Sequence, residues 1–205
     1  IKRKNLDEEI YEILMRMILD GQYRMGQKIS IEEIEKELGV SRTPILGALS
    51  KLAHDGFLQT QRGTGFFAPS FTERDYDEIV EGINLLAMEA FERIMKDDSQ
   101  DYINRLRRLA DVSDDVFRTG DISAYFRADI DFHVEIVKYM DNRRLTEYFQ
   151  KLFTQLCFFY QLSIEREQNP NDVLHPESHH IFCDLLEKKD RDSLYHILIR
   201  DFSKS

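Results

Sequence analysis

The chain has 205 residues, of which 42% are hydrophobic and 32% are charged, and it carries a net charge of −10 at pH 7. This balance is typical of a soluble globular protein, and no apolar run approaches the roughly 18 residues that a membrane span needs. The two cysteines lie outside any CxxC pair, which indicates reduced core residues and not a disulfide framework. The basic N-terminal residues are not followed by the apolar core of a signal peptide, so we expect a cytoplasmic protein with no membrane partner.

The charges are distributed unevenly along the chain. Residues 1–70 hold ten basic and ten acidic side chains, whereas the remainder holds 18 basic and 28 acidic ones. A neutral N-terminal part can still present a basic face, so the overall negative charge does not exclude DNA binding. The asymmetry predicts two parts with different partners, and we place the domains at 1–70 and 71–205.

Three helices are predicted in the first 55 residues. Apolar side chains recur at helical spacing over residues 6–20. Ser30 is placed to cap a second helix over about 31–38, and Gly39 fits the left-handed position that ends it. Ser41 can then cap a third helix that runs to about residue 55.

A β-hairpin is predicted directly after the third helix. Two short β-like runs, 57–60 and 66–68, flank a glycine-containing turn at 61–65. Helix, helix, tight turn, helix and hairpin is the order of a winged helix-turn-helix, in which the third helix enters the major groove of DNA. The order alone leaves open a helical pair that contacts other proteins.

Everything after Phe71 is predicted to be helical. The apolar spacing is close to 3.6 residues, and no proline occurs between Pro69 and Pro170. We therefore expect a mainly α fold, in which the aromatic stripe at 149–160 belongs to the core and does not line a cofactor site. The expected helices lie near residues 72–96, 99–119, 121–140, 142–168, 176–188 and 190–203.

The sequence resembles the GntR family of bacterial transcription regulators. The run LGVSRTPILGALSKLAHDGFL (38–58) is similar to the family signature, and ILDGQYRMGQKIS (18–30) and the hairpin at 62–65 are similar to its flanking segments. The helical remainder resembles the FadR branch, whose FCD-type domain is an antiparallel bundle of six or seven helices with a ligand pocket. The resemblance implies a ligand-responsive repressor that binds palindromic operator DNA as a homodimer, and not an enzyme. Its effector would be a small molecule such as an organic acid or a sugar-derived metabolite.

The resemblance also implies where DNA would be contacted. Arg42 retains a family arginine and is expected to contact a base edge or a phosphate. Two other family arginines are replaced here, by Glu32 and Leu46, which predicts a different operator and weaker binding. The full expected set is Ser41, Arg42, Thr43, Lys51, Arg62, Gly63 and Thr64.

A metal site is suggested by the segment Ala128 to His133. Asp129 and His133 are four residues apart, so their side chains share one helical face at a spacing that suits two metal ligands. Many FadR-branch proteins bind a metal through one Asp and three His, and the resemblance gives the last two places to His179 and Asp201. This donor set suits Zn²⁺, Ni²⁺, Mn²⁺ or Fe²⁺. The spacing of Asp129 and His133 alone fits a hydrogen-bonded pair equally well.

The expected effector pocket departs from that of many metal-containing members. An Arg and a Glu of those proteins correspond to Ile83 and Ala87 here, and an apolar wall cannot hold a carboxylate through a guanidinium. We expect a less acidic effector, or one held by the metal and by residues chosen on helical phase. Two alternatives are a regulator that senses the metal itself and a metal-dependent hydrolase, although a hydrolase has no need of the DNA-binding head. The expected pocket residues are Tyr125, Gln155 and Tyr160.

Overall fold

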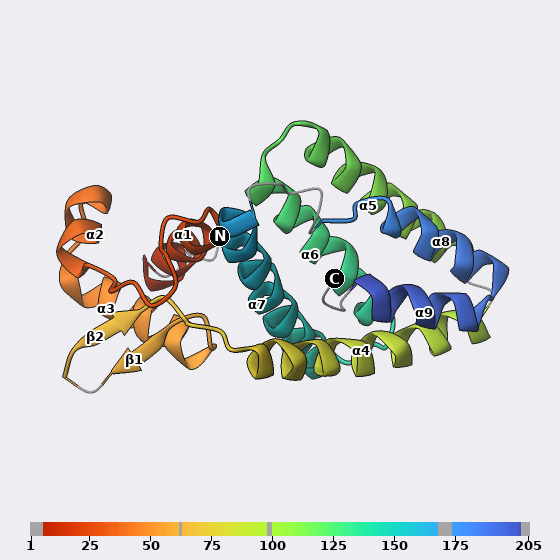
Figure 1. The fold of residues 1–205 in the computed structure, drawn as a ribbon, viewed down its shortest axis with the longest axis horizontal. Coiled ribbons are helices and arrows are strands. Elements are labelled where there is room, and N and C mark those ends of the chain that lie inside the picture. Colours follow the sequence, from red (N-terminus) through yellow and green to blue (C-terminus); the bar gives the residue numbers. More distant parts are fainter. Residues whose placement is uncertain (1–5, 62, 98–99, 168–173, 202–205) are drawn as a thin grey trace.

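A computed structural model describes residues 6–61, 63–97, 100–167 and 174–201, with only the backbone described at 162–167 and 198–201. Three helices and a hairpin form a head at one end of the molecule (residues 6–69), and the remaining helices form a bundle (residues 73–201), as Figure 1 shows. The predicted mainly helical class with a winged head is confirmed. None of the described helices is long and apolar enough to cross a membrane. The elements are α1 (Leu6–Leu19), α2 (Ile31–Leu38), α3 (Arg42–His54), β1 (Gln59–Gln61), β2 (Gly65–Phe67), α4 (Glu73–Lys96), α5 (Gln100–Arg118), α6 (Ile122–Lys138), α7 (Arg143–Glu167), α8 (Ser178–Lys188) and α9 (Arg191–Asp201).

The helix-turn-helix follows from local capping. The Ser30 hydroxyl accepts a hydrogen bond from the backbone N–H of Glu33, which satisfies one free donor at the start of α2. Gly39 has a φ of 64°, the left-handed conformation that ends a helix at little cost for glycine. Ser41 stands at the N-cap position of α3, but its side chain makes no capping hydrogen bond there, contrary to our expectation. The chain therefore turns sharply between α2 and α3, as predicted.

The wing is a two-stranded antiparallel hairpin. Thr60 pairs with Phe66, and the strands lie one or two residues nearer to the turn than the sequence predicts. The reason is that Phe57 and Leu58 are buried in the core of the head and do not extend the first strand. A bridge between Lys28 and Phe67, which the sequence analysis did not foresee, fastens the hairpin to the loop before α2.

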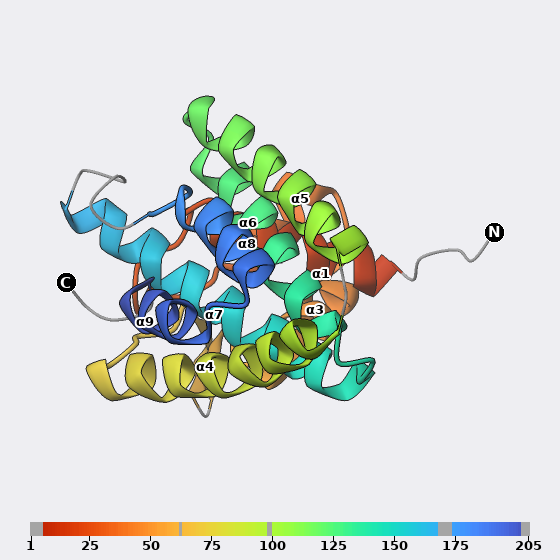
Figure 2. The ribbon, with the colours of Figure 1, turned by 90° about the vertical axis from the view of Figure 1, so that its right-hand side faces the viewer.

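The bundle is built around α6. This helix contacts α4, α5 and α7, and Figure 2 shows it within the bundle when the molecule is viewed from that end. Most of its residues from Tyr125 to Val137 are buried, including the polar side chains of Asp129, His133 and Glu135. The aromatic stripe of α7 belongs to the core, as predicted: Phe149 and Phe153 are buried, and Phe159 and Tyr160 are partly buried and pack against the core. Contacts of α1 with α6 and α7 join the head to the bundle.

We predict that Leu52→Ala destabilises the protein by about 2–5 kcal/mol, the usual cost of truncating a buried leucine. Leu52 is fully buried in the core of the head, on the inner face of α3. Chemical denaturation followed by circular dichroism measures the change. Leu85→Ala is the matched control, because Leu85 is 68% exposed and its loss should change the free energy of unfolding by less than about 0.5 kcal/mol. Equal losses in the two variants would contradict the packing described here.

Candidate metal centre and DNA-binding surface

Three polar side chains from two helices meet inside the bundle. Asp129 and His133 project from one face of α6, and His179 comes from the first turn of α8. The Asp129 Oδ1 atom lies 2.8 Å from His179 Nε2 and 3.6 Å from His133 Nε2. All three residues are buried, and one donor atom from each lies within 4.8 Å of the others. The arrangement is that of three ligands around a common point.

Aromatic rings fix the two imidazoles. The ring of Phe132 stacks on His179 at a centroid distance of 4.1 Å, and the ring of Phe153 stacks on His133 at 4.4 Å. Phe182 meets His133 edge-on at 6.0 Å. These contacts hold the rings in place and exclude water from the cluster, which strengthens every polar interaction inside it.

Burial sets the protonation states around the carboxylate. It lowers the pKa of His133 to about 3, although the charge of Asp129 acts in the opposite direction. Burial also raises the pKa of the Cys157 thiol well above its ordinary value, and its sulfur lies 4.0 Å from Asp129 Oδ2. A neutral imidazole is the form that binds a metal, so His133 is ready to act as a ligand.

The residues present fit a divalent cation. Two atoms that each bind one ion at about 2.1 Å lie roughly 3.0–3.5 Å apart, close to the spacings that Asp129 makes with the two histidines. The Nδ1 atom of His179, on the opposite edge of the ring from Nε2, is buried without a hydrogen-bond partner among the described residues. The fourth expected ligand, Asp201, lies at the end of α9, and its side chain is outside the described residues.

The neighbouring histidine has a different environment. His180 is partly exposed and faces α5, with its Nε2 atom 3.3 Å from Asp114 and 3.6 Å from Asp111. His179, the residue that the family resemblance selected, therefore points to Asp129, and His180 does not.

The outer face of α3 is the candidate DNA-binding surface. Ser41, Arg42 and Thr43 are exposed around its first turn, and Leu46 is exposed one turn further on. The backbone N–H groups of this first turn add a partial positive charge that favours a phosphate. The opposite face of α3 packs into the core, so this outer face is the one that a DNA groove can reach.

Two acidic side chains lie beside the arginine of this surface. The Arg42 Nη1 atom is 3.8 Å from Glu32 and 4.0 Å from Glu35, both on α2, while Arg42 remains 53% exposed. The replacement of a family arginine by Glu32 thus places a carboxylate next to Arg42. These acids lower the positive potential of the surface.

The other expected DNA contacts lie in two separate places. Lys51 faces α1 and not the outer face of α3, because its Nζ atom sits 4.5 Å above the ring of Tyr11. On the wing, Gly63 and Thr64 are exposed at the hairpin turn, where the Thr64 hydroxyl donates to the backbone carbonyl of Gln61. Arg62 lies outside the described residues.

Comparisons with known proteins agree with this arrangement. The model of bacterial regulatory proteins of the gntR family matches residues 6–68, and the FCD domain model matches residues 78–203. The chain belongs to the GntR family, with an FCD domain. It is a transcription regulator, and the family and its relatives are not enzymes.

Relatives of this GntR regulator match along most of their length. An uncharacterized HTH-type transcriptional regulator, YdhC of Bacillus subtilis, is 25% identical over 93% of this chain and 85% of its own. The gluconate operon transcriptional repressor of the same species is 25% identical over 94% of this chain and 79% of its own. The solved structure of E. coli McbR/YncC shares the fold with a TM-score of 0.80 at 20% identity, covering 98% of this chain and 94% of that one.

The residues expected to contact an effector are not all brought together in this GntR regulator. Tyr125 lies on the same face of α6 as Asp129, one turn earlier, and packs against Phe117. Tyr160 lies near the cluster: burial is the main cause of the raised pKa of its phenol, the charge of Asp129 also contributes, and its hydroxyl is 3.4 Å from that of Tyr76. Gln155 instead points to the head, where its side-chain amide donates to a backbone carbonyl.

Sequence reasoning did not find the groups around the cluster. Phe153 and Cys157 come from α7 and belong to the aromatic stripe that indicated only a core helix. Ile83 and Ala87 are both buried in α4, as expected for an apolar wall. The three polar residues could be predicted from spacing and from family likeness, whereas their neighbours depend on how three helices pack.

Proposed function

We propose that this GntR-family regulator is a ligand-responsive repressor. In this proposal, residues 1–70 bind a palindromic operator in the cytoplasm, residues 71–205 pair two chains, and a small-molecule effector binds at a metal-anchored site in the bundle. The observation that carries the proposal is the buried cluster of Asp129, His133 and His179 in a bundle joined to a winged head. The name of the gluconate operon repressor, a relative at 25% identity, supports repression and an effector derived from a sugar or an organic acid.

The head would read DNA through the outer face of α3. In a winged helix-turn-helix dimer, two such helices enter successive major grooves about one DNA turn apart, so the operator mirrors the two-fold symmetry of the protein. Arg42 would contact a base or a phosphate, and Ser41, Thr43, Gly63 and Thr64 are placed for backbone contacts. Lys51 and Arg62 remain proposals, and the position of Lys51 over Tyr11 favours a structural role.

In the bundle, Asp129, His133 and His179 would hold Zn²⁺, Ni²⁺, Mn²⁺ or Fe²⁺, with Asp201 as a fourth ligand. A bound cation supplies a Lewis acid that can take a carboxylate or hydroxyl oxygen of the effector. The aromatic rings that stack on the histidines keep the ligands oriented and the site dry. The buried side chains of Ile83 and Ala87 provide no cation of their own, so the effector would depend on the metal for its anchoring.

Reversing the charge of Arg42 should abolish operator binding. We expect Arg42→Glu to weaken the affinity at least 100-fold, because it removes a charge-assisted contact and adds a third acid beside Glu32 and Glu35. Fluorescence anisotropy with an operator selected from random DNA would measure the affinity. Light scattering would count the chains bound to each operator, of which we expect two. Arg118→Glu, which reverses an exposed arginine of the bundle, is the control. Unchanged binding by Arg42→Glu, or a complex with one chain, would contradict this part of the proposal.

Removing the acid beside Arg42 should have the opposite effect. Glu32→Gln should raise operator affinity by about two- to fivefold at low salt, since an exposed ion pair of this kind is worth up to about 1 kcal/mol. Glu33→Gln is a close control, because Glu33 is also an exposed acid in the first turn of α2 and its loss has the same effect on the helix dipole. If both substitutions change affinity equally, the pairing of Glu32 with Arg42 does not limit DNA binding.

If the metal site is as proposed, substitutions of two adjacent histidines should affect metal binding differently. A divalent ion should raise the melting temperature of chelator-treated protein and bind at one ion per chain, and His179→Gln should lose both effects. At 100 times the dissociation constant, a bound ion stabilises the fold by about 2.7 kcal/mol. His180→Gln, which changes the adjacent histidine facing α5, should behave like the wild type. Retention of the ion by His179→Gln would contradict the proposed site.

Chelator-treated and metal-loaded protein also distinguish an effector-binding regulator from a metal sensor. Asp201→Asn tests the fourth expected ligand by its effect on ion affinity. If ion removal alone changes operator affinity, the metal is the signal. If affinity changes only when an organic acid such as gluconate is added to the loaded protein, the metal anchors an effector.

A further inference from the structure

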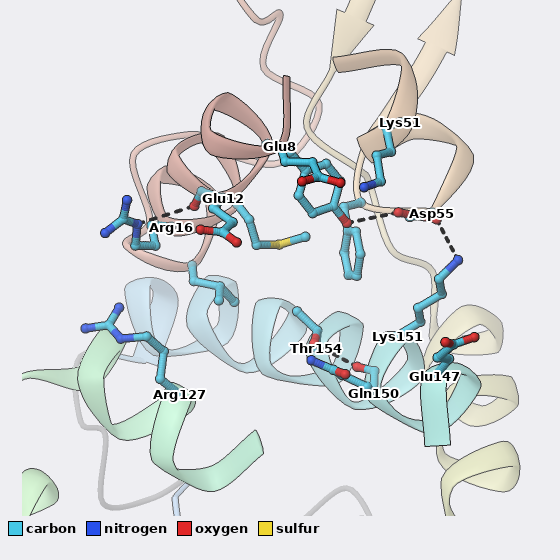
Figure 3. Close-up of a pocket in the computed structure, with 14 residues that line it drawn as sticks. Glu8, Glu12, Arg16, Lys51, Asp55, Arg127, Glu147, Gln150, Lys151 and Thr154 are labelled. Atoms are coloured by element: carbon cyan, nitrogen blue, oxygen red, sulfur yellow. Dashed lines mark hydrogen bonds and ion pairs between the residues drawn. The ribbon is translucent and has the colours of Figure 1, made fainter. Parts of the chain in front are cut away.

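The C-terminal end of α3, the helix proposed to enter the DNA groove, is tied to the bundle at one residue. Asp55 is the C-cap of α3, and its side chain is only 9% exposed. The Lys151 Nζ atom donates to Asp55 Oδ1 at 2.6 Å, and Gln155 Nε2 donates to the Asp55 backbone carbonyl at 3.2 Å. Figure 3 shows Asp55 facing Lys151 of α7. On its other oxygen, Asp55 accepts a hydrogen bond from the Tyr11 hydroxyl at 2.9 Å. We call Asp55, Lys151 and Gln155 the latch.

The conformation of the chain beside the latch brings the head close to α7. Gly56 has a φ of +85°, and a Cβ atom at this position would lie only 2.3 Å from Gln155 Nε2. Any larger residue would therefore strain the backbone and displace the Gln155 amide. The close approach of the two parts at this point depends on a glycine directly after the C-cap of α3.

The opposite side of α7 touches the candidate metal centre. Phe153 stacks on His133, and Cys157 lies 4.0 Å from Asp129 Oδ2. Residues two positions apart on a helix are rotated by about 200°. Lys151 and Gln155 therefore project away from Phe153 and Cys157, and a single helix contacts the cluster on one side and the latch on the other.

An open cleft separates part of the head from the bundle. A cavity of about 660 Å³ lies between α1 and α3 on one side and α6 and α7 on the other (Figure 3). Beyond the cleft, Ser123 of α6 donates to the Leu19 carbonyl at 3.4 Å, and Arg127 lies 3.8 Å from Asp20. The latch thus contacts the end of the recognition helix itself, whereas the second attachment contacts the end of α1.

We propose that the latch carries the regulatory signal: occupancy of the Asp129–His133–His179 site is relayed through α7 to the C-terminal end of α3 by Lys151 and Gln155. This inference rests on the proposed metal site and names how that site reaches the DNA-binding surface. A cation between Asp129 and the histidines shifts the His133 ring against Phe153, and this shift moves α7. Lys151 and Gln155 then act as positioning residues for α3.

Hydrogen exchange of the full-length protein tests the relay with Zn²⁺ alone as the probe. In chelator-treated wild type, adding Zn²⁺ should slow exchange around residues 129–137 and at least threefold around residues 51–58. In Lys151→Met and Gln155→Leu, the slowing around 129–137 should remain and the slowing around 51–58 should be lost. The same variants should reduce any change in operator affinity that Zn²⁺ causes in the wild type.

Two controls separate the relay from general weakening of the fold. Tyr11→Phe removes the 2.9 Å hydrogen bond to the same Asp55 carboxylate, but this bond lies within the head, so the wild-type response should persist. Arg143→Met breaks an ion pair with Glu147 on the surface of α7 and should also respond like the wild type.

Each result has a distinct meaning. Slowing around 129–137 without any around 51–58 in the wild type would overturn the relay while leaving the metal site intact. Persistence of both effects in Lys151→Met and Gln155→Leu would also overturn it. No slowing around 129–137 in the wild type would overturn the metal site, and the relay with it.

Discussion

A carboxylate buried in an apolar helical bundle is the constraint around which the C-terminal part is arranged. Removing such a charge from water costs several kcal/mol, and partners in good geometry must offset that cost. Asp129 has His179 at hydrogen-bond distance, His133 nearby and the Cys157 thiol on its other oxygen. A single carboxylate that faces two imidazoles is also a place where a cation can offset the charge. In the proposed function, the cluster therefore has a state with the cation and a state without it, which differ in charge.

The packing around this cluster connects it to α7. Each imidazole is stacked on a phenylalanine, and interiors packed at this density transmit a displacement instead of absorbing it. Phe132 belongs to α6, the same helix as two of the polar residues, whereas Phe153 belongs to α7. Any change in the seat of His133 thus reaches α7 first. Since α7 also contacts the head, one helix touches both the cluster in the bundle and the end of α3.

The sequence predicted the helices closely because each has a clear apolar period and clear end signals, such as Ser30 and Gly39 around α2. It also predicted the three polar residues of the cluster, since a spacing of four places Asp129 and His133 on one face and family likeness selected His179. Helical phase shows which residues share a face, but not which neighbour that face meets. For this reason Gln155 was expected in the bundle pocket although it contacts Asp55, and Lys51 was expected at DNA although it covers Tyr11.

The hairpin shows the same limit at a smaller scale. Phe57 and Leu58 have the composition of strand residues, yet both side chains are needed to close the core of the head, so the strand begins after them. The bridge from Lys28 to Phe67 joins segments 39 residues apart and has no local signal. Pairings of this kind depend on the tertiary fold, which period and composition do not determine.

The charges of the head bear on how strongly the proposed relay from the bundle to α3 would affect DNA binding. On the outer face of α3, Arg42 has Glu32 and Glu35 beside it, and these two acids weaken the attraction of this face for phosphates. A regulator with weak heads depends on two of them binding together, because the second then acts at a high effective concentration. That gain is lost when the heads no longer match the spacing of the half-sites. In the proposed dimer, a small movement of α3 transmitted through Asp55 would therefore change operator affinity more than in a protein whose single heads bind tightly.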